Sequence, residues 1–230
     1  MSPRDRRRQI PFVVVAPSGT GKTTVCHRVV EGDDGIDFSV SHTTRARREG
    51  EVDGEDYHFV TRSEFERLDA DGAFLESAPY NDNRYGTSWK SLEAPLAEGR
   101  DVLLEIEVQG ARQVREHRGD ACFIFLLPPS MKVLGDRLRG RGTDSPEQIE
   151  RRLDRAREEL EAIRDFDYAV VNDDLDRCVG SVMEIIRAER GEGSEELRRR
   201  FAVAPAYERF KRAGAAGQGD DGRPSGGPVA

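Results

Sequence analysis

The chain has 230 residues, with 36 Lys or Arg and 44 Asp or Glu, so its net charge is −8. This charge argues against a general electrostatic attraction to nucleic acid or to an anionic membrane. No apolar run approaches the roughly 18–20 residues of a membrane span, and the three cysteines lack the spacing of a disulfide framework or a zinc site. We therefore expect a cytoplasmic protein without a nucleic-acid or membrane partner, built as one domain with tails.

Strand and helix signals alternate between about residues 10 and 190. The expected strands are 12–15, 38–42, 57–60, 102–108, 122–127 and 168–171. The expected helices are 22–30, one after a capping box at 63–66, 88–98, one from a capping box at 145–148 to residue 163, and 175–186. Pro95 should kink or restart the helix that contains it. Buried strands that alternate with helices predict an α/β sheet covered by helices.

The two ends of the chain differ in composition from the middle. Residues 1–9 are basic and polar, which indicates a flexible arm. Residues 191–213 form a charged extension with some helical character, which Pro205 should interrupt. Residues 214–230 contain no large apolar side chain except Val229, so we expect a disordered tail.

A glycine-rich loop separates the first expected strand from the first expected helix. Residues 16–23 read A-P-S-G-T-G-K-T, the Walker A pattern with alanine at the first glycine position. The loop glycines let consecutive N–H groups turn toward an anion, and the helix that follows adds positive potential. Lys22 would contact the β- and γ-phosphates, and the Thr23 hydroxyl would bind Mg²⁺. The predicted ATP-binding residues are Ala16, Pro17, Ser18, Gly19, Thr20, Gly21, Lys22, Thr23 and Thr24 in this loop, and Asn172 after the last strand.

Further blocks point to the acceptor of the phosphoryl group. An Arg-rich turn such as 39–48, taken alone, is more often a solvated surface. However, a series of blocks follows in order: S-V-S-H-T-T-R-x-x-R, G-E-V-D-G-E-D-Y, F-L-E, N-R-Y-G-T, L-L-E-I-E-V-Q-G, P-P-S, R-L-R-G-R-G and V-V-N-D-D. Over residues 10–190 these blocks resemble the guanylate kinases.

The resemblance implies a P-loop NTPase three-layer α/β fold with a parallel central sheet. It places a core at 10–37 and 88–190, an inserted mixed-β GMP-binding subdomain at about 38–87 and a helical lid at about 131–157. The implied reaction is ATP + GMP ⇌ ADP + GDP with Mg²⁺, and dGMP would also serve. Whether the chain forms a homo-oligomer is left open.

The resemblance also assigns the GMP site. Arg45, Arg48, Tyr57 and Tyr85 would hold the GMP phosphate, and Ser41, Thr87 and Glu76 would contact guanine. A carboxylate can accept both adjacent donors of guanine, whereas the lone pair on N1 of adenine would face a negative charge. Without the resemblance, Glu76 would be interpreted as a solvated acid at the end of a strand.

Glu105 and Glu107 depart from the family pattern, which has aspartate at least at the second position. Both are expected on one strand face that looks into the nucleotide cleft, and Glu107 would lie on the guanine or magnesium side. The extra methylene moves each carboxylate by more than an ångström, so we assign both to the GMP site with an altered geometry.

The segment 137–157 is rich in arginine, which suits a lid that closes over ATP and neutralises the migrating phosphoryl group. The catalytic residues implied by the resemblance are Lys22, Arg137, Arg141 and Arg152. The other arginines of this segment are assigned to solvated helix faces: Arg139, Arg151, Arg155 and Arg157. Asn172 would border the adenine, and a turn-forming or capping role for it is equally well supported.

Two alternatives to a guanylate kinase remain at this point. One is a binding module that holds phosphopeptides in the monophosphate cleft, but such modules usually lack an intact phosphate loop. The other is a kinase with a different acceptor, which would lack the base-contacting residues. All three polar types expected at Ser41, Glu76 and Thr87 are present.

Overall fold

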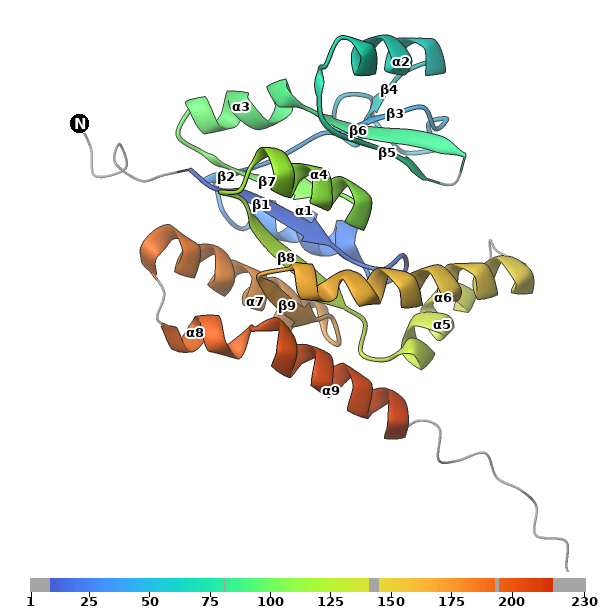
Figure 1. Ribbon diagram of the computed structural model, residues 1–230, viewed down its shortest axis with the longest axis vertical. Helices are drawn as coiled ribbons and strands as arrows, with labels where there is room; N and C mark the ends of the chain where they lie inside the picture. The colour runs from blue at the N-terminus through green and yellow to red at the C-terminus, as the bar shows by residue number, and fades with distance from the viewer. Residues whose placement is uncertain (1–8, 81, 141–144, 193–194, 217–230) are drawn as a thin grey trace, which may run out of the picture.

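The computed structural model describes residues 9–80, 82–140, 145–192 and 195–216. Arg141, nearly all of the basic arm and residues 217–230 of the tail lie outside these ranges. The described chain forms a central sheet covered by helices, with a smaller sheet beside it and a helical pair that extends from one end (Figure 1). In the described ranges, no helix is both long enough and apolar enough to cross a bilayer.

The central sheet has five strands in the order β2-β7-β1-β8-β9, and every neighbouring pair is parallel. Its strands are β1 (Pro11–Val15), β2 (Ile36–Phe38), β7 (Asp101–Glu105), β8 (Cys122–Leu127) and β9 (Tyr168–Val171). All residues of β1 and β8 are buried, as expected for strands covered on both faces. The carboxyl ends of these strands therefore share one edge of the sheet.

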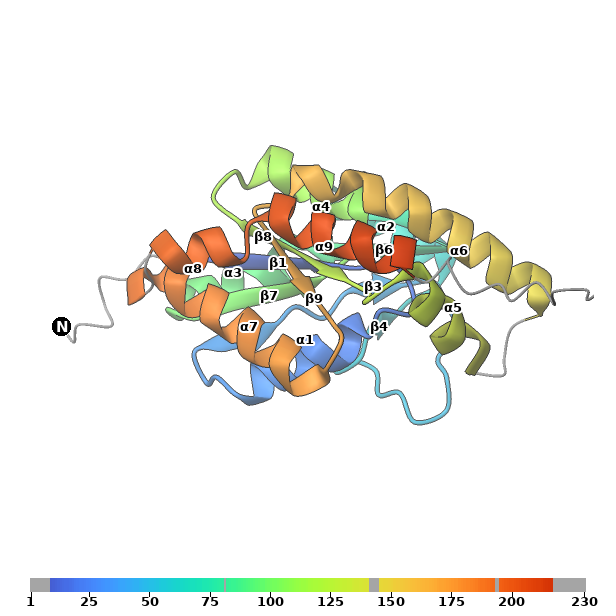
Figure 2. The same cartoon turned by 90° about the horizontal axis from the view of Figure 1, so that it is seen from below.

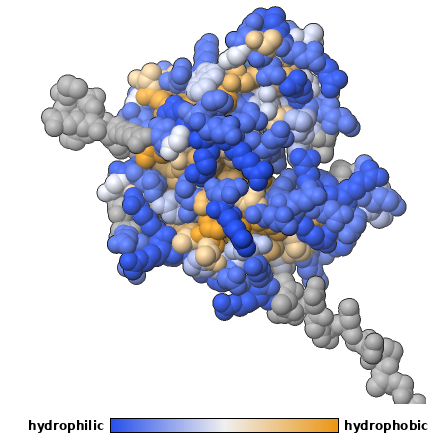
Figure 3. Space-filling view, viewed as in Figure 1, coloured by the Kyte–Doolittle hydropathy of each residue, from blue (hydrophilic) through white to orange (hydrophobic). Residues whose placement is uncertain are grey.

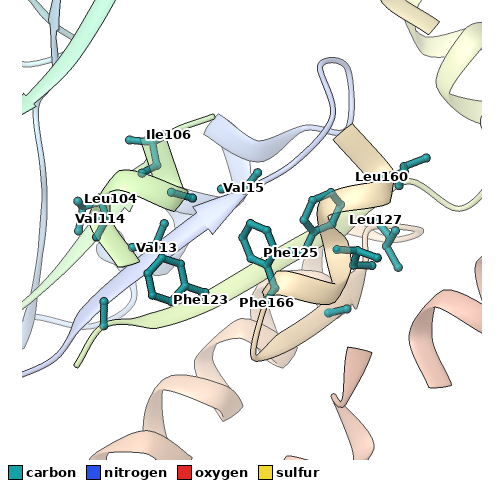
Figure 4. Packing of buried hydrophobic residues seen from close by; sticks show 14 of the residues in the cluster. Val13, Val15, Leu104, Ile106, Val114, Phe123, Phe125, Leu127, Leu160 and Phe166 are labelled. Carbon is teal, nitrogen blue, oxygen red and sulfur yellow. The ribbon is translucent and has the colours of Figure 1, made fainter. Parts of the chain in front are cut away.

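Helices cover both faces of this sheet (Figure 2). One face packs against α1 (Lys22–Glu31) and α7 (Leu175–Arg187), where Phe12 and Ile124 meet Val25 and Val182. The other face packs against α3 (Trp89–Ala97), α4 (Val108–His117), the end of α6 (Pro146–Glu161) and the short helical turn η2 (Ala162–Asp165). Figure 4 shows Phe123 and Phe125 of β8 beside Phe166 in this second core, and both rings lie edge-on to the Phe166 ring.

A smaller mixed sheet forms the insert between β2 and α3. Its strand order is β4-β3-β6-β5, with the bounds β3 (His42–Thr43), β4 (His58–Phe59), β5 (Phe74–Tyr80) and β6 (Asn83–Ser88). The pair β3–β4 is parallel and the other two pairs are antiparallel. Helix α2 (Arg62–Ala70) packs on this sheet through the buried Phe65. We call β3 to β6 together with α2 the insert.

The helical pair that extends from the sheet consists of α5 (Met131–Gly140) and α6, and we call it the lid. It has a small core of its own, formed by Leu134, Leu138, Ile149, Leu153 and Ala156. The capping box predicted at Ser145 is present: the Ser145 hydroxyl accepts from the Gln148 N–H, and the Gln148 side chain accepts from the Ser145 N–H.

Several sequence predictions of local structure are wrong. The strand predicted over 38–42 is absent, because β2 ends at Phe38 and β3 begins at His42 in a different sheet. Strands β5 and β6 were missed altogether. The cap of α2 is Thr61 with Glu64 at the third helical position, two residues before the predicted Ser63, because Thr61 is the residue with extended backbone. The strand predicted over 102–108 ends at Glu105, and Val108 already begins α4. Helix α3 runs unbroken through Pro95, which lies in its last turn, where the missing N–H removes only one hydrogen bond.

The C-terminal extension completes the core. It continues from the turn η3 (Ala188–Glu192) into α8 (Glu195–Arg200) and α9 (Val203–Ala216). The helix break falls at 201–202, before Pro205, because Phe201 accepts from the Ala169 N–H of β9 at 2.9 Å and so leaves the helix. Phe201, Ala206 and Phe210 are buried. The helix also extends three residues into the segment that was predicted to be disordered from residue 214.

The surface is mostly hydrophilic on the face shown in Figure 3, in keeping with a chain in which 35% of the residues are charged. Among the residues that the structure describes, Val52 is the large apolar side chain with substantial exposure.

Candidate active site

The phosphate loop lies at the carboxyl end of β1 and leads into α1. Gly19 and Gly21 have φ angles of 96° and 95°, which a side chain would strain. A Cβ atom at Gly19 would also lie 2.9 Å from Leu138 of the lid, and one at Gly21 would lie 3.0 Å from the Asn172 amide. Both glycines are therefore required by the turn and by the close approach of neighbouring elements.

Lys22 and Thr23 extend from the loop toward the end of β7. The Lys22 ammonium donates to the Ile106 carbonyl at 2.7 Å and to Glu107 at 3.0 Å, and the Thr23 hydroxyl donates to Glu105 at 2.6 Å. Burial by itself would lower the pKa of Lys22, but the carboxylates of Glu107 and Glu105 raise it above its usual value. Lys22 is thus held as a cation at the position where the loop would receive phosphate.

The two glutamates do not share a strand face as predicted. Glu105 is the last residue of β7, whereas Glu107 is the residue that precedes α4. Both contact the phosphate loop, and neither has a hydrogen bond to Glu76 or Thr87 among the described contacts. Their carboxylates lie on the loop side of the cleft.

The Thr23 hydroxyl and the Glu105 carboxylate are hard oxygen ligands of the kind that Mg²⁺ binds. Within the described residues, no group of three or more His, Cys, Asp or Glu side chains could form a complete metal site. This donor set fits Mg²⁺, because that ion is usually bound by one or two protein oxygens together with substrate phosphates and water.

A buried polar pocket lies in the insert. Glu76 is 4% exposed, and its Oε1 accepts from the Thr87 hydroxyl at 2.7 Å; that hydroxyl lies 3.2 Å from the Ser41 hydroxyl. Burial raises the pKa of Glu76 to about 7. The Glu76 Oε2 lies against Gly110 of α4, where a Cβ atom would be only 2.3 Å away. The three predicted base-contacting residues are therefore neighbours, although they come from separate segments of the chain.

An arginine and two tyrosines lie together beside this pocket. Arg45 forms a two-point ion pair with Glu51 at 2.7 and 3.0 Å, which raises the pKa of its guanidinium. Arg45 lies 5.4 Å from the Tyr57 ring centroid, and Tyr57 lies edge-on to Tyr85 at 5.9 Å. Arg48 is exposed, and its backbone N–H donates to the Glu51 carboxylate. Glu51 was missed because it is one acid among several in the block G-E-V-D-G-E-D-Y.

The lid arginines reach the phosphate loop. Arg137 donates to the carbonyls of Thr20 and Asn172 at 3.1 and 3.0 Å, and Arg152 donates to the Ser18 hydroxyl at 2.7 Å. Asn172 is buried and its amide donates to the Thr20 carbonyl at 2.7 Å, so it supports the loop backbone. Thr24 is exposed on α1.

Arg155 was assigned to a solvated helix face, and this assignment is wrong. Its guanidinium lies 4.0 Å from the centroid of the Tyr80 ring in the insert, and it also pairs with the buried Glu159 at 3.1 Å. Helical spacing could not distinguish Arg155 from its exposed neighbours, because the residue that it contacts lies 75 positions earlier in the chain.

Comparison with known proteins shows which family combines these sites. A sequence profile described as "Guanylate kinase" matches residues 8–189. The chain belongs to the guanylate kinase family. The guanylate kinase of Neisseria gonorrhoeae is 52% identical over 186 residues, which cover 81% of this chain and 91% of that protein. The guanylate kinase of Lactococcus lactis is 49% identical over 184 residues, or 80% and 90% of the two chains.

A crystal structure of guanylate kinase from Anaplasma phagocytophilum has the same fold. It superposes with a TM-score of 0.68 at 36% identity, and the match covers 80% of this chain and 87% of that one. The predicted resemblance and the predicted P-loop fold are thus confirmed. Membership of the guanylate kinase family also confirms the predicted enzyme class, a nucleoside monophosphate kinase that is an ATP:GMP phosphotransferase.

Proposed function

We propose that this guanylate kinase phosphorylates GMP and dGMP in the cleft between the phosphate loop, the insert and the lid. The observation that supports this most directly is the position of Glu76. It is buried in the insert with Thr87, and its Oε2 lies against Gly110 of α4, the helix that begins directly after the Glu107 bonded to Lys22. The Glu76 carboxylate, which would bind guanine, therefore lies close to the Lys22 ammonium, which would bind the ATP phosphates.

On the ATP side, Lys22 binds the β- and γ-phosphates, while Arg137 and Arg152 approach the transferred group from the lid. Both arginines already contact the loop backbone or the Ser18 hydroxyl. Arg141 has the same role on the basis of the sequence alone. The acceptor oxygen of GMP is ionised before the reaction, so no general base is required and catalysis consists of positioning and charge neutralisation.

On the GMP side, Arg45, Arg48, Tyr57 and Tyr85 hold the phosphate. Glu51 orients the Arg45 guanidinium through its two-point ion pair, so less conformational freedom is lost when the phosphate binds. An ionised Glu76 accepts hydrogen bonds from both donors of guanine, and Thr87 keeps the carboxylate in place.

Thr23 and Glu105 are the residues that would hold Mg²⁺. When bound, this ion neutralises negative charge on the β- and γ-phosphate oxygens. Glu107 then holds the Lys22 ammonium instead of contacting the base, which differs from the role that the family pattern implied. Within this proposal, the protein acts in the cytoplasm.

A coupled assay of ADP release with GMP, dGMP, AMP, CMP and UMP tests the proposal. We expect fast turnover with the two guanine nucleotides and slow turnover with AMP. Comparable rates with AMP would overturn the guanine assignment. A chain that binds GMP but never releases ADP would instead be a binding module, an outcome that the intact phosphate loop argues against.

Glu76→Gln gives a sharper test of the base site. The amide keeps the size of the side chain but offers only one acceptor atom, so GMP turnover should fall far more than ATP affinity. Unchanged kinetics with GMP would remove Glu76 from the base site while leaving the phosphate-loop assignment intact.

A further inference from the structure

Tyr80 connects the insert to the lid, although the sequence assigns it no role. It is the last residue of β5 and pairs with Asn83 of β6. Its ring lies edge-on to Tyr85 of the insert at 6.1 Å. The Arg155 guanidinium of the lid covers its ring at 4.0 Å. One half-buried side chain thus touches both the insert and the lid.

Arg155 is fixed from its other side. Its Nε donates to the buried Glu159 one turn later at 3.1 Å, which limits the positions that the long side chain can adopt. Arg152, one turn earlier on α6, donates to the Ser18 hydroxyl of the phosphate loop at 2.7 Å. Two arginines one turn apart on the lid helix therefore contact two other parts of the site: Arg155 contacts Tyr80 of the insert, and Arg152 contacts the phosphate loop.

These contacts do not hold the lid itself together. The lid has its own apolar core, which includes Leu134, Leu138 and Leu153, and Arg155 is not part of it. The insert likewise packs around Phe65, whose ring stacks on Phe74 at the other end of β5 from Tyr80. The Arg155–Tyr80 contact thus fixes how the lid sits on the insert, and it contributes little to the folding of either part.

We propose that Tyr80 and Arg155 are positioning residues, which couple the GMP-binding insert to the lid and set the placement of Arg152 at the transferred phosphoryl group. Neither residue touches the reacting atoms; they act through the position of α6, which also carries Arg152 to the phosphate loop. The proposal rests on the role of Arg152 given above. Because the contacts to both nucleotides are left in place, loss of the pair lowers kcat and leaves the KM values nearly unchanged.

A double-mutant cycle of Arg155→Met and Tyr80→Leu tests this coupling. Methionine keeps an unbranched apolar side chain but removes the charge that interacts with the ring. We expect each single change to lower the single-turnover rate roughly 3- to 30-fold, with KM for GMP and ATP within about twofold of wild type. The double variant should be no slower than the slower single variant, because both changes remove the same contact.

Arg157→Met is the matched control. Arg157 lies on the same helix, is exposed and pairs with Asp154, and this change should leave rates and melting temperature unaltered. A wild-type rate for Arg155→Met, or a double variant whose rate loss is the product of the two single losses, would overturn the proposal. Arg155 is only half buried, so its comparison with Arg157 stands even if Tyr80→Leu fails to fold.

Two further variants separate the parts of the proposal. Tyr80→Phe keeps the ring under Arg155 and removes only the hydroxyl, so it should retain coupling to Arg155 in the cycle. Arg152→Ala tests the role on which the proposal rests. If Arg152→Ala is slow and Arg155→Met is not, the positioning proposal alone fails; if Arg152→Ala is fast, the catalytic role of Arg152 fails first.

Discussion

Gly110→Ala should damage the guanine site through a single added methyl group. Gly110 lies on α4, and an ideal Cβ atom there would be 2.3 Å from Glu76 Oε2 and 2.9 Å from Glu76 Cδ. Relief of this overlap requires a shift of about 1 Å, and a displacement of that size can cost about 100-fold in rate. Rotation of the Glu76 carboxylate cannot relieve the overlap, because it would break the 2.7 Å hydrogen bond from the Thr87 hydroxyl, and Glu76 is only 4% exposed.

The effects on stability and on kinetics should differ. Alanine in a helix gains about 0.5–1 kcal/mol over glycine, while overpacking of this kind costs about 1–3 kcal/mol. The net loss of stability is therefore small. We expect kcat/KM for GMP to fall about 100-fold, while KM for ATP stays near wild type, because Gly110 does not touch the phosphate loop.

Gly180→Ala is the control for this experiment. Gly180 lies inside α7, and a Cβ atom there would meet nothing within 4 Å. It should raise the free energy of unfolding by about 0.5–1 kcal/mol without any change in kinetics. Wild-type kinetics with GMP for Gly110→Ala would refute the view that Glu76 must stay where it is to read guanine.

Three more predictions concern charge and folding. Burial raises the pKa of Glu76 to about 7, so a decreasing fraction is ionised as the pH falls from 8 to 6; KM for GMP should rise, and Glu76→Gln should lack this dependence. The folded state also binds this proton more tightly than the unfolded chain, whose glutamate pKa is about 4.3. Urea titrations should therefore show that the contribution of Glu76 to the free energy of unfolding falls as the pH rises from about 4.3 to 7. Glu76→Gln should abolish this pH-dependent contribution. Lys22→Ala should lower turnover by at least about 10²–10³-fold with the fold retained, and retained activity would disprove the phosphate-loop role. Truncation after residue 192 removes two buried phenylalanines, Phe201 and Phe210. It should cost about 3–6 kcal/mol of unfolding free energy, and an unchanged urea midpoint would contradict this.

The sequence predicted what depends on neighbours in the chain. The phosphate loop is a local pattern between a buried strand and a helix, and the positions of β1, β8 and β9 followed from runs of apolar residues. The capping box at Ser145 was found because its partner, Gln148, is three residues away. Among the base-contacting residues, Glu76 could be proposed only through the family resemblance, because an isolated acid has no local signal.

Contacts between distant segments could not be predicted. In the sequence, Gly110 resembles any other helical glycine. Only the packing of β5 against α4 shows that Glu76 leaves no room for a larger side chain at this position. Arg155 is one of many arginines in the chain, and nothing in its spacing reveals Tyr80. The boundary of β7 was misplaced for a related reason. The residues Ile106 and Glu107 continue the apolar alternation, but they form the connection that brings Glu107 to Lys22.

The C-terminal extension changes what counts as the folding unit of this enzyme. The family match ends at residue 189, yet the last strand of the sheet donates a backbone hydrogen bond to Phe201, and the apolar core includes Ala206 and Phe210. During synthesis these residues emerge after every residue with an assigned catalytic role. The nascent chain therefore has its complete nucleotide site before its core can close, and a chain released before Phe201 would expose apolar surface to aggregation.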